Sequence, residues 1–76
     1  MNNKRRNLLK KAQNLLESAS EIITEVLEQE QDSLDNTPEN LQESEKCTKM
    51  EDAIDNLEAS IECIDNAKDN INEAIS

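Results

Sequence analysis

The sequence has no histidine, no glycine and no aromatic residue. Without histidine it lacks the side chain that serves most often as a general base and as a metal ligand. Without glycine it cannot form the glycine-rich loops that hold phosphate groups, and without aromatic rings it has no surface on which bases stack. We therefore expect a protein that is not an enzyme, has no catalytic residue, metal site or cofactor, and does not bind nucleic acid directly.

Cysteine and long apolar runs are also scarce. Cys47 and Cys63 stand 16 residues apart in what reads as one helix, which separates them by about 24 Å and excludes a disulfide between them. No segment approaches the ~20 apolar residues of a membrane span, and Lys10 and Lys11 follow the first apolar pair too early for a secretory signal. These absences predict a cytoplasmic protein with reduced thiols and no membrane contact.

What the sequence does contain is a regular spacing of apolar residues. In the first half, one row advances in steps of 4, 3, 4, 3 and 4 residues, and we name it the Leu8 row: Leu8, Ala12, Leu15, Ala19, Ile22 and Val26. A second row with a period of seven runs beside it, the Leu9 row: Leu9, Leu16 and Ile23. Three apolar positions in every seven are typical of a helix that faces the core of a bundle. We predict a helix over residues 4–30.

The second half carries one apolar row with a single charged exception. The row consists of Met50, Ile54, Leu57, Ile61, Ile64, Lys68, Ile71 and Ile75, and it is flanked by the small residues Ala53, Ser60, Ala67 and Ala74. Thr48 and Glu51 form a capping box, which predicts a helix over residues 48–75. Lys68 interrupts the row, and we expect it to fix the register by reaching past Ala67 to a carboxylate on the opposing helix.

Residues 31–47 connect the two predicted helices. Pro38 cannot continue a helix from before it but suits a first helical turn capped by Thr37, so the connector contains a short helix over residues 38–44 or a kink. Two helices joined by such a break predict one all-α domain over residues 1–76, an antiparallel helical hairpin. Two registers are open: Ile64 faces Ala12, or, one heptad further along, Ile64 faces Ala19.

A hairpin buries one apolar row of each helix, yet the first helix carries two apolar rows. We expect the Leu8 row to face the second helix and the Leu9 row to stay exposed in a single hairpin. The smallest closed solution is a homodimer that forms a four-helix bundle, and the alternatives are a higher oligomer or a monomer completed by another protein. The predicted self-association residues are Leu9, Leu16, Ile23, Ala53 and Ala67.

The charges are strongly one-sided, with 18 acidic against 8 basic residues and a net charge of −10. Six carboxylates of the second helix advance in steps of 4, 3, 4, 3 and 4, and we name them the acidic ridge: Glu51, Asp55, Glu58, Glu62, Asp65 and Asp69. Surface helices usually mix charges at this spacing, because opposite pairs stabilise them by ~0.2–0.5 kcal/mol each. The acidic ridge is either a solvated face that keeps the protein soluble or a surface that binds a protein with a basic surface.

Five of the eight basic residues lie in the first eleven positions and form the basic end: Lys4, Arg5, Arg6, Lys10 and Lys11. Basic residues at a helix start oppose the helix dipole, so nearby carboxylates stabilise them. In an antiparallel hairpin the basic end lies beside Asp65, Asp69 and Glu73, which favours this fold-back. The other interpretation is a binding site for a small anionic ligand.

Residues 34–59 resemble a group of small acidic two-helix proteins of unknown function from low-GC Gram-positive bacteria and their prophages. The similar features are Asn36, the run Pro38-Glu39-Asn40-Leu41-Gln42-Glu43-Ser44-Glu45, the pair Met50-Glu51 and the heptads that follow. The resemblance implies a helical hairpin with an accessory role in a mobile element. It transfers no site residues.

These features predict a non-enzymatic protein–protein interaction module, a homo-oligomeric acidic bundle that docks on another protein. One alternative is an acidic inhibitor that imitates nucleic acid and blocks a nucleic-acid-binding enzyme, as an anti-defence protein of a phage or mobile element does. The acidic ridge has one carboxylate per ~5 Å of helix, against one charge per ~1.7 Å of duplex DNA, so such a mimic needs several ridges side by side. The other alternative is a small anionic-ligand binder that uses the basic end.

Overall fold

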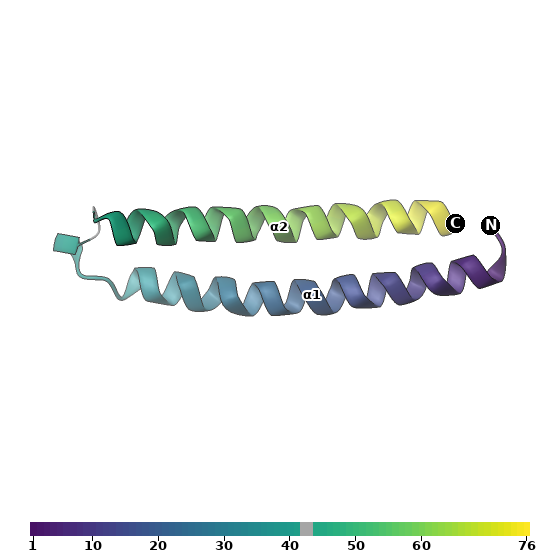
Figure 1. Cartoon of the computed structure of the whole chain (residues 1–76), viewed down its shortest axis with the longest axis horizontal. Coiled ribbons are helices and arrows are strands. Elements are labelled where there is room, and N and C mark those ends of the chain that lie inside the picture. The colour runs from purple at the N-terminus through teal and green to yellow at the C-terminus, as the bar shows by residue number, and fades with distance from the viewer. Residues whose placement is uncertain (42–43) are drawn as a thin grey trace.

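The computed structural model describes residues 1–41 and 44–76, which form two long helices and a connector. Helix α1 spans Asn3–Asp35, the 3₁₀ helix η1 spans Glu39–Leu41, and helix α2 spans Glu45–Ile75. The long helices lie side by side and antiparallel, with both termini at one end and the connector at the other (Figure 1). The molecule measures 59 × 15 × 13 Å. The predicted all-α antiparallel hairpin is confirmed.

Helix α1 ends at Asp35 and not at residue 30 as predicted. Asn2 caps its start, because its side-chain oxygen accepts a hydrogen bond from the backbone N–H of Arg5 at 2.8 Å. The last turn contains no helix breaker, and Leu34 is half-buried there. Thr37 stabilises the end of α1, since its hydroxyl donates to the carbonyl of Ser33 at 2.9 Å, and Pro38 then prevents further helix.

Helix α2 begins at Glu45, so the predicted start at residue 48 is wrong. Ser44 is the N-cap residue, and its hydroxyl oxygen accepts a hydrogen bond from the backbone N–H of Cys47 at 3.3 Å. Thr48 lies inside the helix, where its hydroxyl donates to the carbonyl of Ser44 at 3.3 Å. The earlier start has a packing reason, because it places Cys47 in the interface, where it is fully buried.

The connector is therefore shorter than the predicted range 31–47. It contains the 3₁₀ helix Glu39–Leu41 where the sequence predicts a short helix over residues 38–44. Residues 42 and 43 of that predicted helix lie outside the described residues.

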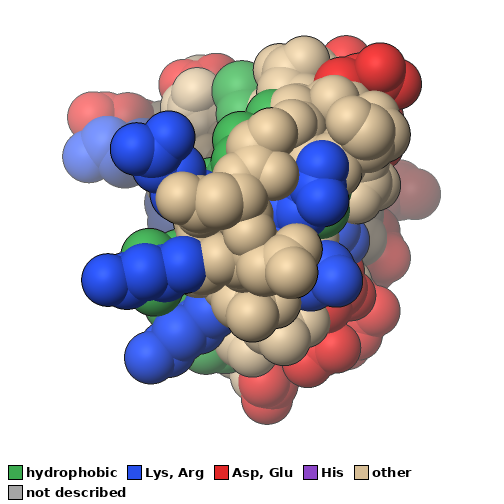
Figure 2. All heavy atoms as spheres, turned by 90° about the vertical axis from the view of Figure 1, so that its right-hand side faces the viewer, with side chains coloured by type: hydrophobic (Ala, Val, Ile, Leu, Met, Phe, Trp, Pro, Cys, Tyr) green, Lys and Arg blue, Asp and Glu red, His purple; other side chains and the backbone are tan. Residues whose placement is uncertain are grey.

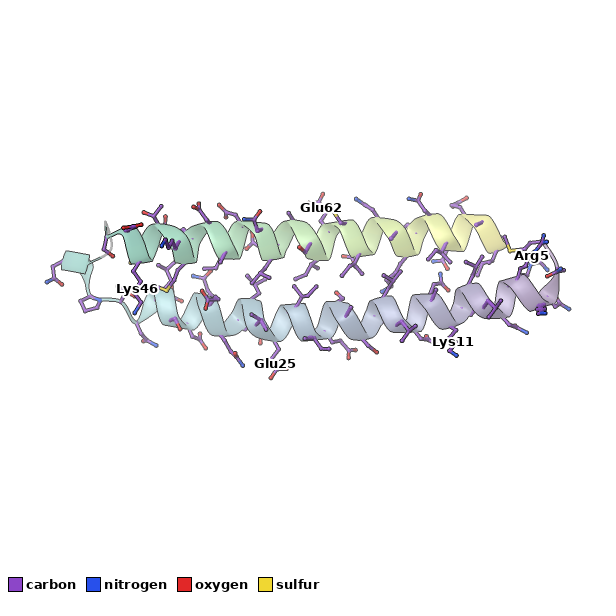
Figure 3. The ribbon with its side chains drawn as sticks, viewed as in Figure 1. Arg5, Lys11, Glu25, Lys46 and Glu62 are labelled. Carbon is purple, nitrogen blue, oxygen red and sulfur yellow. The ribbon has the colours of Figure 1, made fainter. Side chains whose placement is uncertain are left out.

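The apolar row of α2 faces α1, as predicted. Every member from Met50 to Ile75 is buried or half-buried, and Ile54 is the most enclosed at 6% exposure. The row also extends back to Cys47, one heptad before Ile54. Side chains from both helices fill the space between the ribbons in Figure 3.

The row of α1 that packs against α2 is the Leu9 row, so the expectation that this row stays exposed is wrong. Its three members are half-buried, and so are Leu27 and Leu34, which lie four and eleven residues after Ile23 and extend the same face towards the connector. The Leu8 row continues after Val26 with the polar residues Gln29 and Ser33. The Leu9 row therefore supplies apolar contacts along the whole of α2, from Cys47 to Ile75, which the shorter Leu8 row cannot do.

Polar contacts between the helices identify the register. The side-chain amide of Gln13 donates to the carbonyl of Lys68 at 3.3 Å and to the side-chain oxygen of Asn72 at 2.6 Å, and the ammonium of Lys68 donates to Glu17. The first predicted register puts Glu17 level with Ala59, and the second puts it level with Asn66. The observed contacts agree with the second register, in which Ile64 lies opposite Ala19.

The capping role of Ser44 can be tested against Thr48. We expect Ser44→Ala to lower the free energy of unfolding by about 1 kcal/mol, because it leaves a helix N–H without its acceptor. Thr48→Ala is the matched control, and it should leave stability unchanged or raise it, since alanine has the higher helix propensity. Urea unfolding followed by circular dichroism measures both. A larger loss for Thr48→Ala would show that the helix begins at residue 48.

Candidate functional site

The acidic ridge lies on the outer side of α2. All six of its residues are exposed, and Glu62, which the ridge contains, points away from α1 in Figure 3. Among residues 1–41 and 44–76 there are two salt bridges, Glu45 with Lys49 at 3.5 Å and Glu17 with Lys68, and neither involves the ridge. The ridge carboxylates therefore form no salt bridge within the described part of the chain, although Asp65 and Asp69 lie close enough to Lys68 for their charges to raise its pKa.

Lys68 neutralises a carboxylate of the opposing helix, as predicted from its place in the apolar row. Its side chain is 29% exposed and that of Glu17 is 52% exposed, so the pair lies at the margin of the helix interface. The hydrogen bond with Glu17 raises the pKa of Lys68 above its ordinary 10.5; desolvation lowers this pKa, and the negative charges of Glu17, Asp65 and Asp69 raise it further. The net shift is upward.

The basic end is spread around the first turns of α1. Arg6 is half-buried, whereas Lys4, Arg5, Lys10 and Lys11 are exposed, and Arg5 and Lys11 lie at different heights and point in different directions in Figure 3. The structure does not gather the five side chains into one anion site. Nor does any of them form a salt bridge with Asp65, Asp69 or Glu73, since both salt bridges among the described residues lie elsewhere.

A face of exposed apolar side chains runs along α1. Leu8 is 60% exposed, Leu15 65%, Ile22 63% and Val26 42%. These are the large residues of the Leu8 row, and they lie beside the interface with α2. Sequence reasoning assigned self-association to the Leu9 row instead. The length of the apolar row in α2 is the signal that would have favoured the Leu9 row as its partner.

The other predicted self-association residues lie on α2. Ala53 and Ala67 are half-buried beside the helix interface, while Ser60 and Ala74 at the equivalent heptad positions are exposed. Viewed from the end with the termini, Lys and Arg project on the left and to the right of centre, and Asp and Glu lie at the lower right and along the top (Figure 2).

In residues 1–41 and 44–76 no group of three Cys, Asp or Glu side chains is arranged to hold a metal ion. Neither long helix in that part of the chain has a stretch apolar enough to cross a lipid bilayer. No protein-family model matches the chain, and comparisons with curated proteins and with solved structures find no similar protein. The resemblance to small acidic proteins of prophages thus stays a prediction.

The Lys68–Glu17 pair predicts a stability loss at alkaline pH. Because the pKa of Lys68 is raised in the folded state, the contribution of the pair is fully present below the unfolded pKa near 10.5 and is lost as the pH rises through the folded pKa. We expect Glu17→Gln to destabilise the hairpin at neutral pH and to differ less from the wild type above pH 10.5.

Urea midpoints of the wild type and Glu17→Gln across this pH range measure the effect. Glu21→Gln is the control, because Glu21 is exposed on the same helix and forms neither of the two salt bridges among the described residues. A destabilisation by Glu17→Gln that stays constant with pH, or that Glu21→Gln reproduces, would contradict the assigned role of the pair.

Proposed function

We propose that this protein is a non-enzymatic protein–protein interaction module of the cytoplasm, a homo-oligomeric acidic helical bundle whose acidic ridge docks on a protein with a basic surface. The observation that carries the proposal is the exposure of all six ridge carboxylates together with the absence of a cation paired to them among the described residues. A ridge of this kind is ready to pair with lysines and arginines of another molecule, because no intramolecular ion pair has to break first.

The spacing of the ridge supports recognition of a protein surface. Like charges at three- and four-residue spacing weaken a helix by roughly the 0.2–0.5 kcal/mol that opposite pairs contribute. The sequence repeats this unfavourable arrangement five times along one line of α2, although lysines in alternate positions would serve solubility equally well. Binding of a basic partner offsets the repulsion between neighbouring ridge carboxylates, which accounts for the repeated arrangement.

Nucleic-acid mimicry is the second candidate, and the dimensions count against it for a single hairpin. A net charge of −10 is distributed over a molecule 59 Å long, whereas duplex DNA carries one charge per ~1.7 Å. The third candidate, binding of a small anion at the basic end, is weakened by the spread of its side chains around α1. An origin in a phage or another mobile element is a further prediction from the resemblance alone.

The docking surface is tested by comparing two triple variants with the same change of charge. The ridge variant carries Glu58→Gln, Glu62→Gln and Asp65→Asn. The control variant on α1 carries Glu21→Gln, Glu28→Gln and Asp35→Asn. We expect proteins retained from a lysate of the native host by the wild type and the control to be lost by the ridge variant, with an affinity lower by roughly tenfold, since each exposed pair contributes ~0.2–1 kcal/mol.

The same experiment separates the candidates. Docking on a protein surface predicts that the retained protein is basic and that duplex DNA does not displace it. A nucleic-acid-binding enzyme that duplex DNA does displace would favour the inhibitor instead. Equal retention by the wild type and both variants would overturn the proposal, because the acidic ridge would then be only a solvated face.

A further inference from the structure

An uncharged face runs along one flank of the hairpin. The contacts of Glu17 with Lys68 and of Gln13 with Asn72 lie on one flank of the α1–α2 interface. The helical positions on the opposite flank are occupied by apolar residues of α1 and by small residues of α2. We name this flank the open face, and it consists of the Leu8 row of α1 together with Ala53, Ser60, Ala67 and Ala74 of α2.

The open face has the character of an incomplete interface. Leu8, Leu15 and Ile22 are each at least 60% exposed and are spaced by seven residues, so they form a continuous apolar ridge about 21 Å long. Ala12 and Ala19 lie between them, and both are small and half-buried. Apolar surface that is continuous over this length in a water-soluble helix marks a site of association.

Charged residues border the open face in a definite order. The row next to it on α1 contains Lys4, Lys11, Ser18, Glu25 and Asp32, again at seven-residue intervals. Lys11 and Glu25 both point away from α2 in Figure 3 and are exposed. The border is therefore basic in the first half of α1, neutral at Ser18 and acidic in the second half.

A second copy of the same helix complements this order only when it runs antiparallel. A twofold axis at the level of Glu17 places Leu8 opposite Val26 of the second copy, Ala12 opposite its Ile22 and Leu15 opposite its Ala19. The smaller residue of each pair then receives the larger one, as close packing requires. A parallel copy would instead place Lys11 beside Lys11 and Glu25 beside Glu25.

The same axis matches the charges. It brings Lys11 within two residues of Glu25 of the second copy and Lys4 within two residues of Asp32, a stagger of about 3 Å that a lysine side chain spans, and each pair occurs twice by symmetry. Ser18, the neutral residue of the border, lies one residue from the axis and therefore close to its own copy. The apolar layers and the charged border therefore specify one register between them, although they are different residues.

Helix α2 is compatible with this axis. Because Glu17 contacts Lys68, the neighbouring Ala67 lies at the level of the axis. Ser60 and Ala74 stand seven residues to either side of it, so the twofold operation places Ser60 opposite Ala74 of the second copy and Ala67 opposite itself. Side chains this small let the two α2 helices approach closely.

We infer that the open face binds a second copy of this chain, with α1 packed antiparallel on α1 about a twofold axis at the level of Glu17. The inference deepens the homo-oligomeric part of the proposed function and replaces the predicted self-association residues of α1 with the Leu8 row. The mirrored order of charges identifies the occupant, since a helix from an unrelated protein has no reason to carry the same series reversed.

The first test is the mass in solution of two single variants. Leu15→Glu places a charge in the centre of the open face, while Asn14→Glu adds the same charge to an exposed neighbouring position on another side of α1. Sedimentation equilibrium should give a dimer for the wild type and Asn14→Glu and a monomer for Leu15→Glu. Circular dichroism checks that Leu15→Glu keeps its helices, which is expected because Leu15 is 65% exposed in the hairpin.

The second test uses the charged border and identifies the orientation. Lys11→Glu alone places two Glu–Glu pairs in the dimer, and Glu25→Lys alone places two Lys–Lys pairs. Each should raise the dimer dissociation constant by roughly three- to tenfold, less so at high salt. A mixture of the two variants should dimerise like the wild type, because both border pairs in the mixed dimer join opposite charges.

A monomeric wild type, a dimer that persists in Leu15→Glu, or a mixture that dimerises no better than its components would overturn the inference. A monomeric wild type would also overturn the homo-oligomeric part of the proposed function, whereas the other outcomes bear on the inference alone. The ridge variant with Glu58→Gln, Glu62→Gln and Asp65→Asn changes none of the open-face or border residues, so it should still form the dimer. Failure of the dimer with intact partner capture would refute this packing and leave the docking proposal standing.

Discussion

The fold depends on one contact surface, the packing of the Leu9 row of α1 against the apolar row of α2. It is a thin surface: among the described residues, Cys47 and Ile54 alone are buried, and the other apolar members are half-exposed. Two helices have no third layer to close over them. The polar contacts at the margin are correspondingly important, since Gln13, Glu17 and Lys68 distinguish one register from another that the apolar residues allow equally well.

How well the buried face of each helix can be predicted from the sequence depends on how many apolar rows the helix carries. Helix α2 has a single row, interrupted only by Lys68, and its buried face was therefore predicted correctly. Helix α1 has two apolar rows that overlap over the first three heptads, and local spacing alone does not show which of them packs against α2. The choice is made by tertiary packing, because α2 offers apolar contacts as far as Cys47 and only the row ending at Leu34 extends that far.

The start of α2 is likewise decided by tertiary packing and not by the local sequence. Ser44 and Thr48 both suit an N-cap position, and the sequence motif around Thr48 is the stronger one locally. Ser44 prevails because the longer helix buries Cys47 against α1. The exposed position of the acidic ridge, in contrast, could be predicted in full, since its spacing places it away from the apolar row regardless of which face of α1 is the partner.

The distribution of apolar and acidic side chains over the surface follows from the packing of the Leu9 row against α2. Once the Leu9 row is used inside the hairpin, the Leu8 row is left on one flank, and the carboxylates lie on the other sides. A hairpin of this size buries too small a fraction of its surface to be more than marginally stable, so covering the open face with a second copy would stabilise folding as well as assembly. On this view, assembly and docking use different sides of one molecule. The apolar flank completes the core, and the outer side of α2 stays free for a basic partner.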